Sequence, residues 1–124
     1  MKYMLDANSV INLLSGQFPQ LTARVAATDA GDIGISSVAF AEVAMGSENG
    51  KPPRPALLDG LIEEIPLLPF DEAAARAYAC VPFKRGNFDR LIAAHALSLE
   101  LIVISRNVDD FSKVPGLKVE NWTV

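Results

Sequence analysis

The sequence predicts an α/β domain with a mainly parallel central sheet of about four to five strands and helices on both faces. Short apolar runs alternate with stretches whose apolar residues recur at helical spacing, which is typical of strand–helix–strand units. The clearest strand is Leu101–Ser105, an apolar run with β-branched residues of the kind found in buried parallel strands. Polar residues follow several predicted strands, and ligand sites in such sheets lie at the carboxyl ends of the strands.

Each element is predicted from apolar spacing and from the residues that begin and end helices. Strands are predicted at 2–5, 32–36, 101–105 and 117–120, with an extended segment at 66–69. Helices are predicted from Asn8 or Ser9 to Gly16, over 21–30, from Ser36 or Ser37 to about Met45, over 56–65, from the cap Asp71 to about Ala79, and over 87–100. The segment 46–55 is rich in Gly and Pro, which is typical of an exposed loop.

The composition favours one folded domain that spans residues 1–124. Hydrophobic residues make up 50% of the chain and the mean hydropathy is +0.23, so a full core is expected and disorder is not. The single cysteine, Cys80, excludes an internal disulfide and suits a reducing cytosol, so a cytoplasmic protein is expected. No apolar run is long enough to span a bilayer, so no membrane partner is expected.

Three carboxylates that stand alone in apolar stretches are the candidate catalytic residues, namely Asp6, Glu42 and Asp89. Asp6 follows the first predicted strand, whereas Glu42 and Asp89 each share a helix face with apolar residues. A buried carboxylate without a partner destabilises the fold, so three of them indicate a functional role. Converging oxygen ligands favour Mg²⁺ or Mn²⁺, and such an ion commonly acts on phosphate. Each acid alone also has a structural explanation, such as a cap at Asp6 or a favourable helix-dipole contact at Asp89.

Basic residues gather near the third acid in the sequence, although the net charge of −4 argues against nucleic-acid binding. They are Lys84, Arg85, Arg90 and Arg106. Arg85, Arg90 and Arg106 are the candidate substrate-binding residues, since cations would hold a nucleic-acid backbone while the acids hold a metal. In the alternative interpretation each is a solvated surface charge.

Five short motifs are spread along the chain, with the sequences MLDAN (4–8), ISS (35–37), AEV (41–43), FDRLIAAHAL (88–97) and VPGLKVENW (114–122). In combination and spacing they resemble the PIN-domain ribonucleases, specifically the VapC-type toxins of bacterial toxin–antitoxin pairs. The resemblance implies a PIN-like fold and a Mg²⁺- or Mn²⁺-dependent endoribonuclease. Asp6, Glu42 and Asp89 match the acidic triad of the family, and Asn8 and Ser36 match polar positions that support the metal site.

The chain departs from the family pattern after the last long strand. Many PIN domains carry a fourth acid there, whereas this chain has Asn107, an amide, in Ser105-Arg106-Asn107. Asp110 is the nearest acid that would substitute, through a water molecule, and Asp109 is the alternative. These changes leave the triad intact and leave open whether one metal ion or two are bound.

The resemblance also implies partners. A VapC-type toxin cleaves RNA, is usually a homodimer, and is held by a small VapB-type antitoxin whose tail crosses the active site. Operator DNA would be bound by the antitoxin and not by this chain. The sequence does not identify the RNA or the cleavage site.

Two other functions stay open on the sequence alone. A catalytically inactive PIN-like interaction module would only bind a partner, and the amide at Asn107 is compatible with that. A phospho-acceptor receiver domain has a similar size and a Mg²⁺ pocket. It would need paired acids after the first strand and a lysine in the position of Arg106.

Three further residues are predicted to be structural. His95 is six residues from Asp89 and therefore faces away from the acids on a helix. Trp122 is assigned to the core or to a dimer contact. Cys80 is predicted to be a small buried residue.

Overall fold

A computed structural model describes residues 1–81 and 87–124. The strands in this part of the chain are β1 (Tyr3–Leu5), β2 (Ile33–Ser36), β3 (Leu67–Leu68), β4 (Ile102–Ile104) and β5 (Val119–Glu120). The helices are α1 (Ala7–Ser15), α2 (Pro19–Ala27), α3 (Ser37–Glu48), α4 (Pro55–Glu64), α5 (Glu72–Ala79), α6 (Phe88–Leu99) and α7 (Val108–Phe111), with a 3-10 helix at Ala30–Asp32. Every predicted strand and helix is confirmed with shifted ends, and the short α7 is additional.

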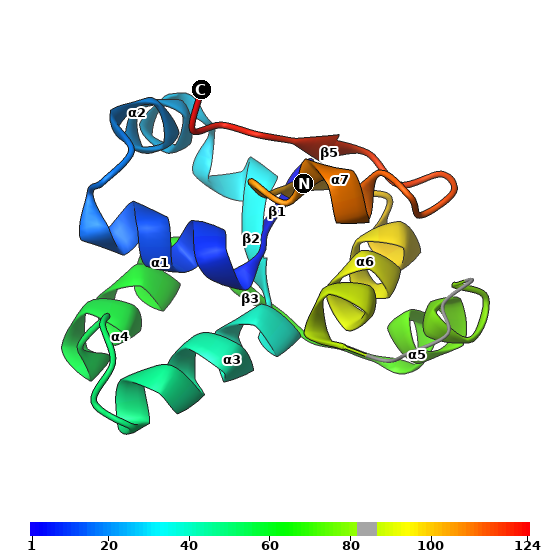
Figure 1. The fold of residues 1–124 in the computed structure, drawn as a ribbon, viewed down its shortest axis with the longest axis horizontal. Coiled ribbons are helices and arrows are strands. Elements are labelled where there is room, and N and C mark those ends of the chain that lie inside the picture. The colour runs from blue at the N-terminus through cyan, green and yellow to red at the C-terminus, as the bar shows by residue number, and fades with distance from the viewer. Residues whose placement is uncertain (82–86) are drawn as a thin grey trace.

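The five strands form one parallel sheet in the order β3-β2-β1-β4-β5. β1 lies in the centre, where Leu5 pairs with Ile35 of β2 on one side and with Ile104 of β4 on the other. α1, α2 and α4 lie on one side of the sheet and α5, α6 and α7 on the other, while α3 contacts both α1 and α6 (Figure 1). The connections therefore change sides between β1 and β4. In open parallel sheets, a change of this kind creates a ligand-binding crevice at the carboxyl ends of the strands.

The first helix begins immediately after the first strand. Asp6 is its N-cap, because an Asp6 side-chain oxygen accepts a hydrogen bond from the backbone N–H of Ser9 at 2.9 Å. The prediction that Asn8 or Ser9 is the cap was wrong, because no loop separates β1 from α1. Gly16 ends α1 as predicted, in the left-handed conformation with φ of 71°.

Polar caps also begin the two other helices that carry candidate acids. The Ser36 hydroxyl accepts from the backbone N–H of Val38 at 3.2 Å and starts α3. The Asn87 side chain accepts from the backbone N–H of Arg90 at 2.9 Å and starts α6. Each cap satisfies a donor that the helix leaves unpaired, and so fixes where the helix begins relative to the sheet.

The core lies between the sheet and the helices on its two sides. Its fully buried members include Leu5, Ile35, Val103 and Ile104 on the strands. Their strands are covered on both faces, which explains why they are continuous apolar runs in the sequence. No helix in the described ranges is both long enough and apolar enough to cross a membrane.

Trp122 packs the segment after β5 against the sheet. It is 1% exposed, its ring meets the ring of Tyr3 edge to face at 4.8 Å, and its indole N–H donates to a Glu120 carboxylate oxygen at 2.8 Å. The Arg24 guanidinium lies 4.6 Å from the centre of the Trp122 ring and 3.5 Å from Glu120. The predicted core role of Trp122 is confirmed. The predicted burial of Cys80 was wrong, because α5 ends there and leaves the thiol exposed.

Candidate active site

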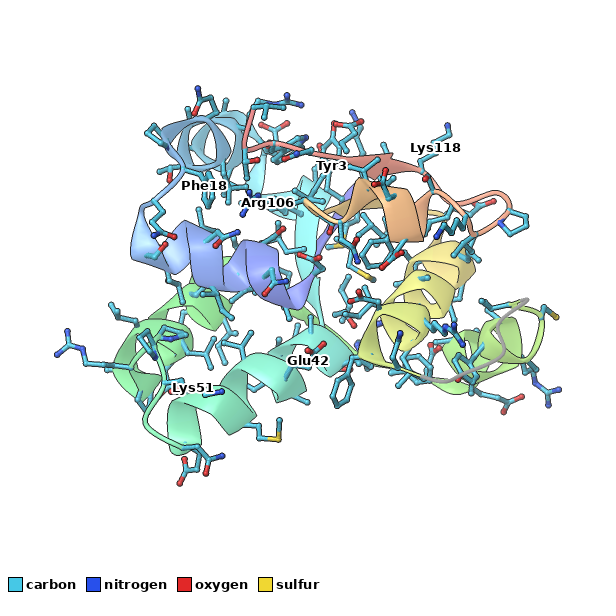
Figure 2. All side chains as sticks on the ribbon, in the orientation of Figure 1. Tyr3, Phe18, Glu42, Lys51, Arg106 and Lys118 are labelled. Carbon is cyan, nitrogen blue, oxygen red and sulfur yellow. The ribbon has the colours of Figure 1, made fainter. Side chains whose placement is uncertain are left out.

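The three candidate acids come from three different elements that meet at the carboxyl end of the sheet. Asp6 directly follows β1, Glu42 lies in the first half of α3, and Asp89 lies in the first turn of α6. Asp6 is 3% exposed, and the other two acids are partly buried. Glu42 lies on the part of α3 that faces α1 and α6 (Figure 2). We call these three residues the acid site.

The acid site is an unfavourable place for three negative charges. Burial is the largest cause in each case and raises the pKa of Asp6, of Glu42 and of Asp89. The charge of Asp89 further raises the pKa of Asp6 and of Glu42, and the charge of Asp6 raises the pKa of Glu42. The three carboxylates are therefore close enough to repel one another, although 83 positions separate the first from the last.

The surroundings of the acids differ. Asp6 accepts hydrogen bonds from the backbone N–H of Ser9 and from the side chain of Ser105, and these bonds act to lower its pKa. One oxygen of Glu42, Oε1, is buried and has no hydrogen-bond partner. A buried carboxylate oxygen that lacks a donor is costly, and a bound cation would satisfy it. Among the described residues, however, no three acids, histidines or cysteines already lie close enough to hold one ion.

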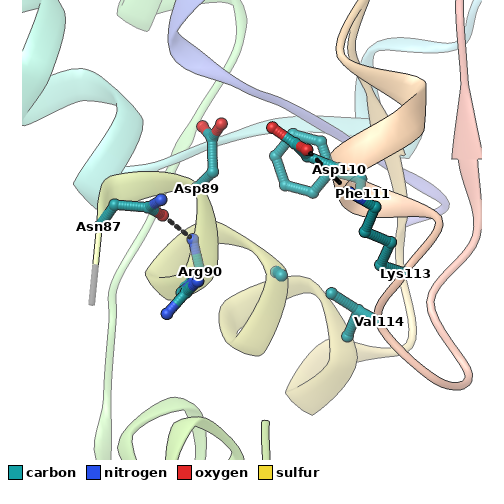
Figure 3. Close-up of a pocket in the computed structure, with 8 residues that line it drawn as sticks. Asn87, Asp89, Arg90, Asp110, Phe111, Lys113 and Val114 are labelled. Carbon is teal, nitrogen blue, oxygen red and sulfur yellow. Dashed lines mark hydrogen bonds and ion pairs between the residues drawn. The ribbon is translucent and has the colours of Figure 1, made fainter. Parts of the chain in front are cut away.

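Asn107 occupies the position of the missing fourth acid. Its Nδ2 donates to Oδ2 of Asp89 at 3.0 Å and to Oδ2 of Asp110 at 3.1 Å. Asp110 also lies 3.7 Å from the Lys113 ammonium group. Asp89, Asp110 and Lys113 line a pocket of about 200 Å³ whose wall also includes Phe111 (Figure 3). The amide of Asn107 thus links Asp89 to Asp110, the acid predicted to substitute for the fourth one.

The two polar residues predicted to support the metal site lie differently from each other. Asn8 is exposed on the first turn of α1, and no hydrogen bond joins it to an acid of the described chain. The Ser36 hydroxyl is 2.9 Å from Nδ1 of His95 and caps α3. Ser36 therefore fixes the start of the helix that carries Glu42.

His95 is fully buried and lies with Ser36, away from the acids, as predicted. Its ring also meets the ring of Phe70 edge to face at 5.4 Å. Burial lowers the pKa of His95, although the backbone of Pro69 and the charge of Asp71 act to raise it. The packed imidazole thus joins α6 to Ser36 at the end of β2.

The two candidate basic residues that the structure describes, Arg90 and Arg106, line different hollows. Arg85 and Lys84 lie outside the described residues. Arg90 lines the pocket beside Asp89, but its side chain points away from that acid (Figure 3). Arg106 is exposed, and its guanidinium lies 4.7 Å from the centre of the Phe18 ring (Figure 2).

A second hollow lies beside the acid site, and the sequence interpretation did not find it. We call it the amide cleft, and it has a volume of about 520 Å³. Its wall includes Asn8, Asn12, Arg106, Asn107, Asn121 and Thr123. The sequence carried two signals for it. Asn12 stands one helical turn after Asn8, and Asn121 directly follows the last strand.

Comparison with known proteins places this geometry in a family. The model of the PIN domain family matches residues 3–117. The tRNA(fMet)-specific endonuclease VapC of Shigella flexneri is 31% identical, with 99% of each chain covered, and ribonuclease VapC2 of Haemophilus influenzae is 30% identical, with 98% of each covered. The crystal structure of DNA-bound VapBC from Salmonella typhimurium contains a chain that superposes with a TM-score of 0.86 at 28% identity, covering 98% of both chains. This chain therefore belongs to the PIN-domain family, and within it to the VapC-type ribonuclease toxins of VapBC toxin–antitoxin systems.

Proposed function

We propose that the acid site hydrolyses RNA phosphodiester bonds with the aid of Mg²⁺ or Mn²⁺ held by Asp6, Glu42 and Asp89. The observation that carries the proposal is the buried Glu42 oxygen without a donor, next to two other acids whose charges repel it. An isolated acidic cluster would relieve this repulsion by protonation. A divalent cation relieves it while the carboxylates stay ionised, and these oxygen donors suit such an ion.

Each acid has a separate role in this proposal. When bound, the cation would supply a Lewis acid that offsets charge on the phosphodiester and activates water. Asp6 is held rigid by its cap bond to Ser9 and is the fixed ligand. Asp89 is oriented by the Asn107 amide. Glu42 is the one acid with a buried oxygen that lacks a donor, so it either completes the ligand set or orients the attacking water as a base.

Purified, partner-free chain incubated with a small-RNA pool tests this function. Discrete fragments are expected with Mn²⁺ and not with EDTA. An Asp6→Asn variant, purified in parallel, controls for contaminating nuclease and is expected to be inactive. Equal fragments from both proteins, or cleavage that persists in EDTA, would overturn the proposal.

We propose transfer RNA as the first substrate to test. Its support is the Shigella flexneri relative, which is named as specific for tRNA(fMet). Purified initiator tRNA and an unrelated tRNA of equal length should be compared under the same conditions. Preferential cleavage of the initiator tRNA is the expected result, and equal cleavage of both would remove this substrate assignment.

We also propose that the chain forms a homodimer and is neutralised by a small VapB-type antitoxin, which alone contacts operator DNA. The support for the antitoxin is the likeness to the DNA-bound VapBC structure, whereas the homodimer and the DNA contact through the antitoxin rest on the resemblance to VapC-type toxins. Co-expression with the neighbouring small reading frame, followed by size-exclusion chromatography with light scattering, would test it. Loss of RNA cleavage in the co-purified complex is expected. A complex that remains fully active would contradict it.

A further inference from the structure

We propose that the amide cleft binds the nucleotide next to the scissile phosphate, with Arg106 on a phosphate and the amides of Asn12 and Asn121 on the base. This inference rests on the proposed ribonuclease function and extends it to substrate recognition. It concerns residues outside the acid triad, and two of them, Asn12 and Asn121, have no predicted role in metal binding.

The position of the cleft connects it to the acid site. Its wall is built from residues that follow β1, β4 and β5, namely Asn8, Arg106, Asn107 and Asn121. The ends of β1 and β4 are the point where the connections change sides, and ligands of open parallel sheets bind at such points. Asn107 belongs to the cleft wall and also donates to Asp89 at 3.0 Å. A strand of RNA cleaved at the acid site would therefore place a neighbouring nucleotide at the cleft.

The one charged side chain of the described residues that lines the cleft is basic, in contrast to the acid site beside it, and Val124 completes the lining. No aspartate or glutamate side chain of the described residues lines it. Arg106 has no carboxylate within ion-pair distance in the described chain, and its guanidinium is held against the Phe18 ring at 4.7 Å. A guanidinium fixed on an aromatic face keeps its N–H donors available, and these donors match phosphate oxygens.

The amides of the cleft have hydrogen-bonding groups that the protein does not use. Within the described residues no hydrogen bond engages the side chain of Asn8 or of Asn12. Asn121 accepts from the backbone N–H of Thr123 at 2.9 Å and from its hydroxyl at 2.6 Å through Oδ1, which leaves its NH₂ group to donate elsewhere. Amide side chains present a donor and an acceptor together, the pattern by which a base edge is recognised. Unstacked bases of single-stranded RNA expose such edges.

Two measurements on the full chain test the proposal. The first is binding of a fluorescently labelled single-stranded oligoribonucleotide in EDTA, followed by anisotropy, which does not depend on cleavage. The second is steady-state cleavage with Mn²⁺ of a substrate series that varies the base on each side of the cut. The variants are Arg106→Ala and Asn12→Ala, with the exposed residues Arg54 and Asn49, which do not line the cleft, replaced by alanine as controls. Asn121 is left intact because it holds Thr123.

Arg106→Ala is expected to weaken metal-free RNA binding about tenfold and to raise KM by a similar factor, with kcat within about twofold. Asn12→Ala is expected to flatten the base preference at one position next to the cut. Neither control should change binding or preference. Wild-type binding, KM and base preference in both cleft variants would overturn the inference and leave the cleft as a solvent-filled hollow. If the wild type bound RNA but did not cleave it, the proposed function would fail while the binding experiment still decided this inference.

Discussion

Replacing Asp6 by asparagine should separate the destabilising effect of its buried charge from its proposed role in metal binding. Asp6 is 3% exposed and burial raises its pKa, so its negative charge destabilises the metal-free protein. Asparagine is as good a helix N-cap as aspartate and keeps the oxygen that accepts from Ser9. We therefore expect metal-free Asp6→Asn to melt at or above the wild-type temperature.

Mn²⁺ should reverse that order, so that the wild type melts at a higher temperature than Asp6→Asn. At about 100 times its Kd, a ligand that binds only the folded state stabilises it by about 2.7 kcal/mol. For 124 residues the entropy of unfolding is about 0.26 kcal/mol/K, so the wild-type Tm should rise by about 10 °C. Substitution of residues that only contact a metal ligand weakens metal binding by up to about 100-fold. If Asp6→Asn loses that much affinity, Mn²⁺ at the same concentration stabilises the variant by about 0.4 kcal/mol, which raises its Tm by about 2 °C.

Thermal unfolding followed by circular dichroism, in EDTA and in Mn²⁺, measures both effects. NaCl at the same ionic strength controls for general salt stabilisation. The reasoning would be refuted if metal-free Asp6→Asn melted several degrees below the wild type, since Asp6 would then be needed as a charged cap. An equal Mn²⁺ shift in both proteins would refute the assignment of Asp6 as a ligand.

The same pair of proteins gives a prediction for pH. The pKa of Asp6 is raised above its ordinary value of 3.8. As pH rises, the unfolded state therefore releases this proton at a lower pH than the folded state does. Stability from this group is therefore present at low pH and is lost as pH rises through the raised pKa. The stability advantage of Asp6→Asn should be near zero below about pH 4 and grow with pH. Urea unfolding without metal across this range tests it, and an advantage that shrinks with pH would contradict it.

Two further substitutions test the surroundings of the acid site and the packing of the chain end. Asn107→Asp removes the amide that links Asp89 and Asp110 and adds a third negative charge. It should lower the metal-free Tm and tighten Mn²⁺ binding about tenfold by calorimetry, whereas Asn107→Ala should lower the Tm without tightening binding. Trp122→Ala removes a buried ring that contacts Tyr3 and should lower the Tm by more than about 10 °C. Trp122→Phe should cost less, because it loses mainly the indole hydrogen bond, and equal losses from both variants would show that the ring packing contributes little.

Much of this protein follows from local patterns in its sequence. The order of strands and helices was predictable because apolar spacing and helix caps act over a few residues, as the Leu101–Ser105 run and the Asp71 cap illustrate. Asp6, Glu42 and Asp89 were candidates because a carboxylate in an apolar stretch is conspicuous without any structure. Their assignment as metal ligands stays a prediction.

The tertiary structure alone decided which polar groups meet. The bonds from Asn107 to Asp89 and from Ser36 to His95 join residues 18 and 59 positions apart, and no local pattern marks them. They exist because β1 lies between β2 and β4, which brings the ends of β2, β1 and β4 to one edge of the sheet. The amide cleft arises in the same way, from side chains after three strands. Strand order is fixed by the packing of the whole core, so partnerships at the sheet edge depend on the complete fold.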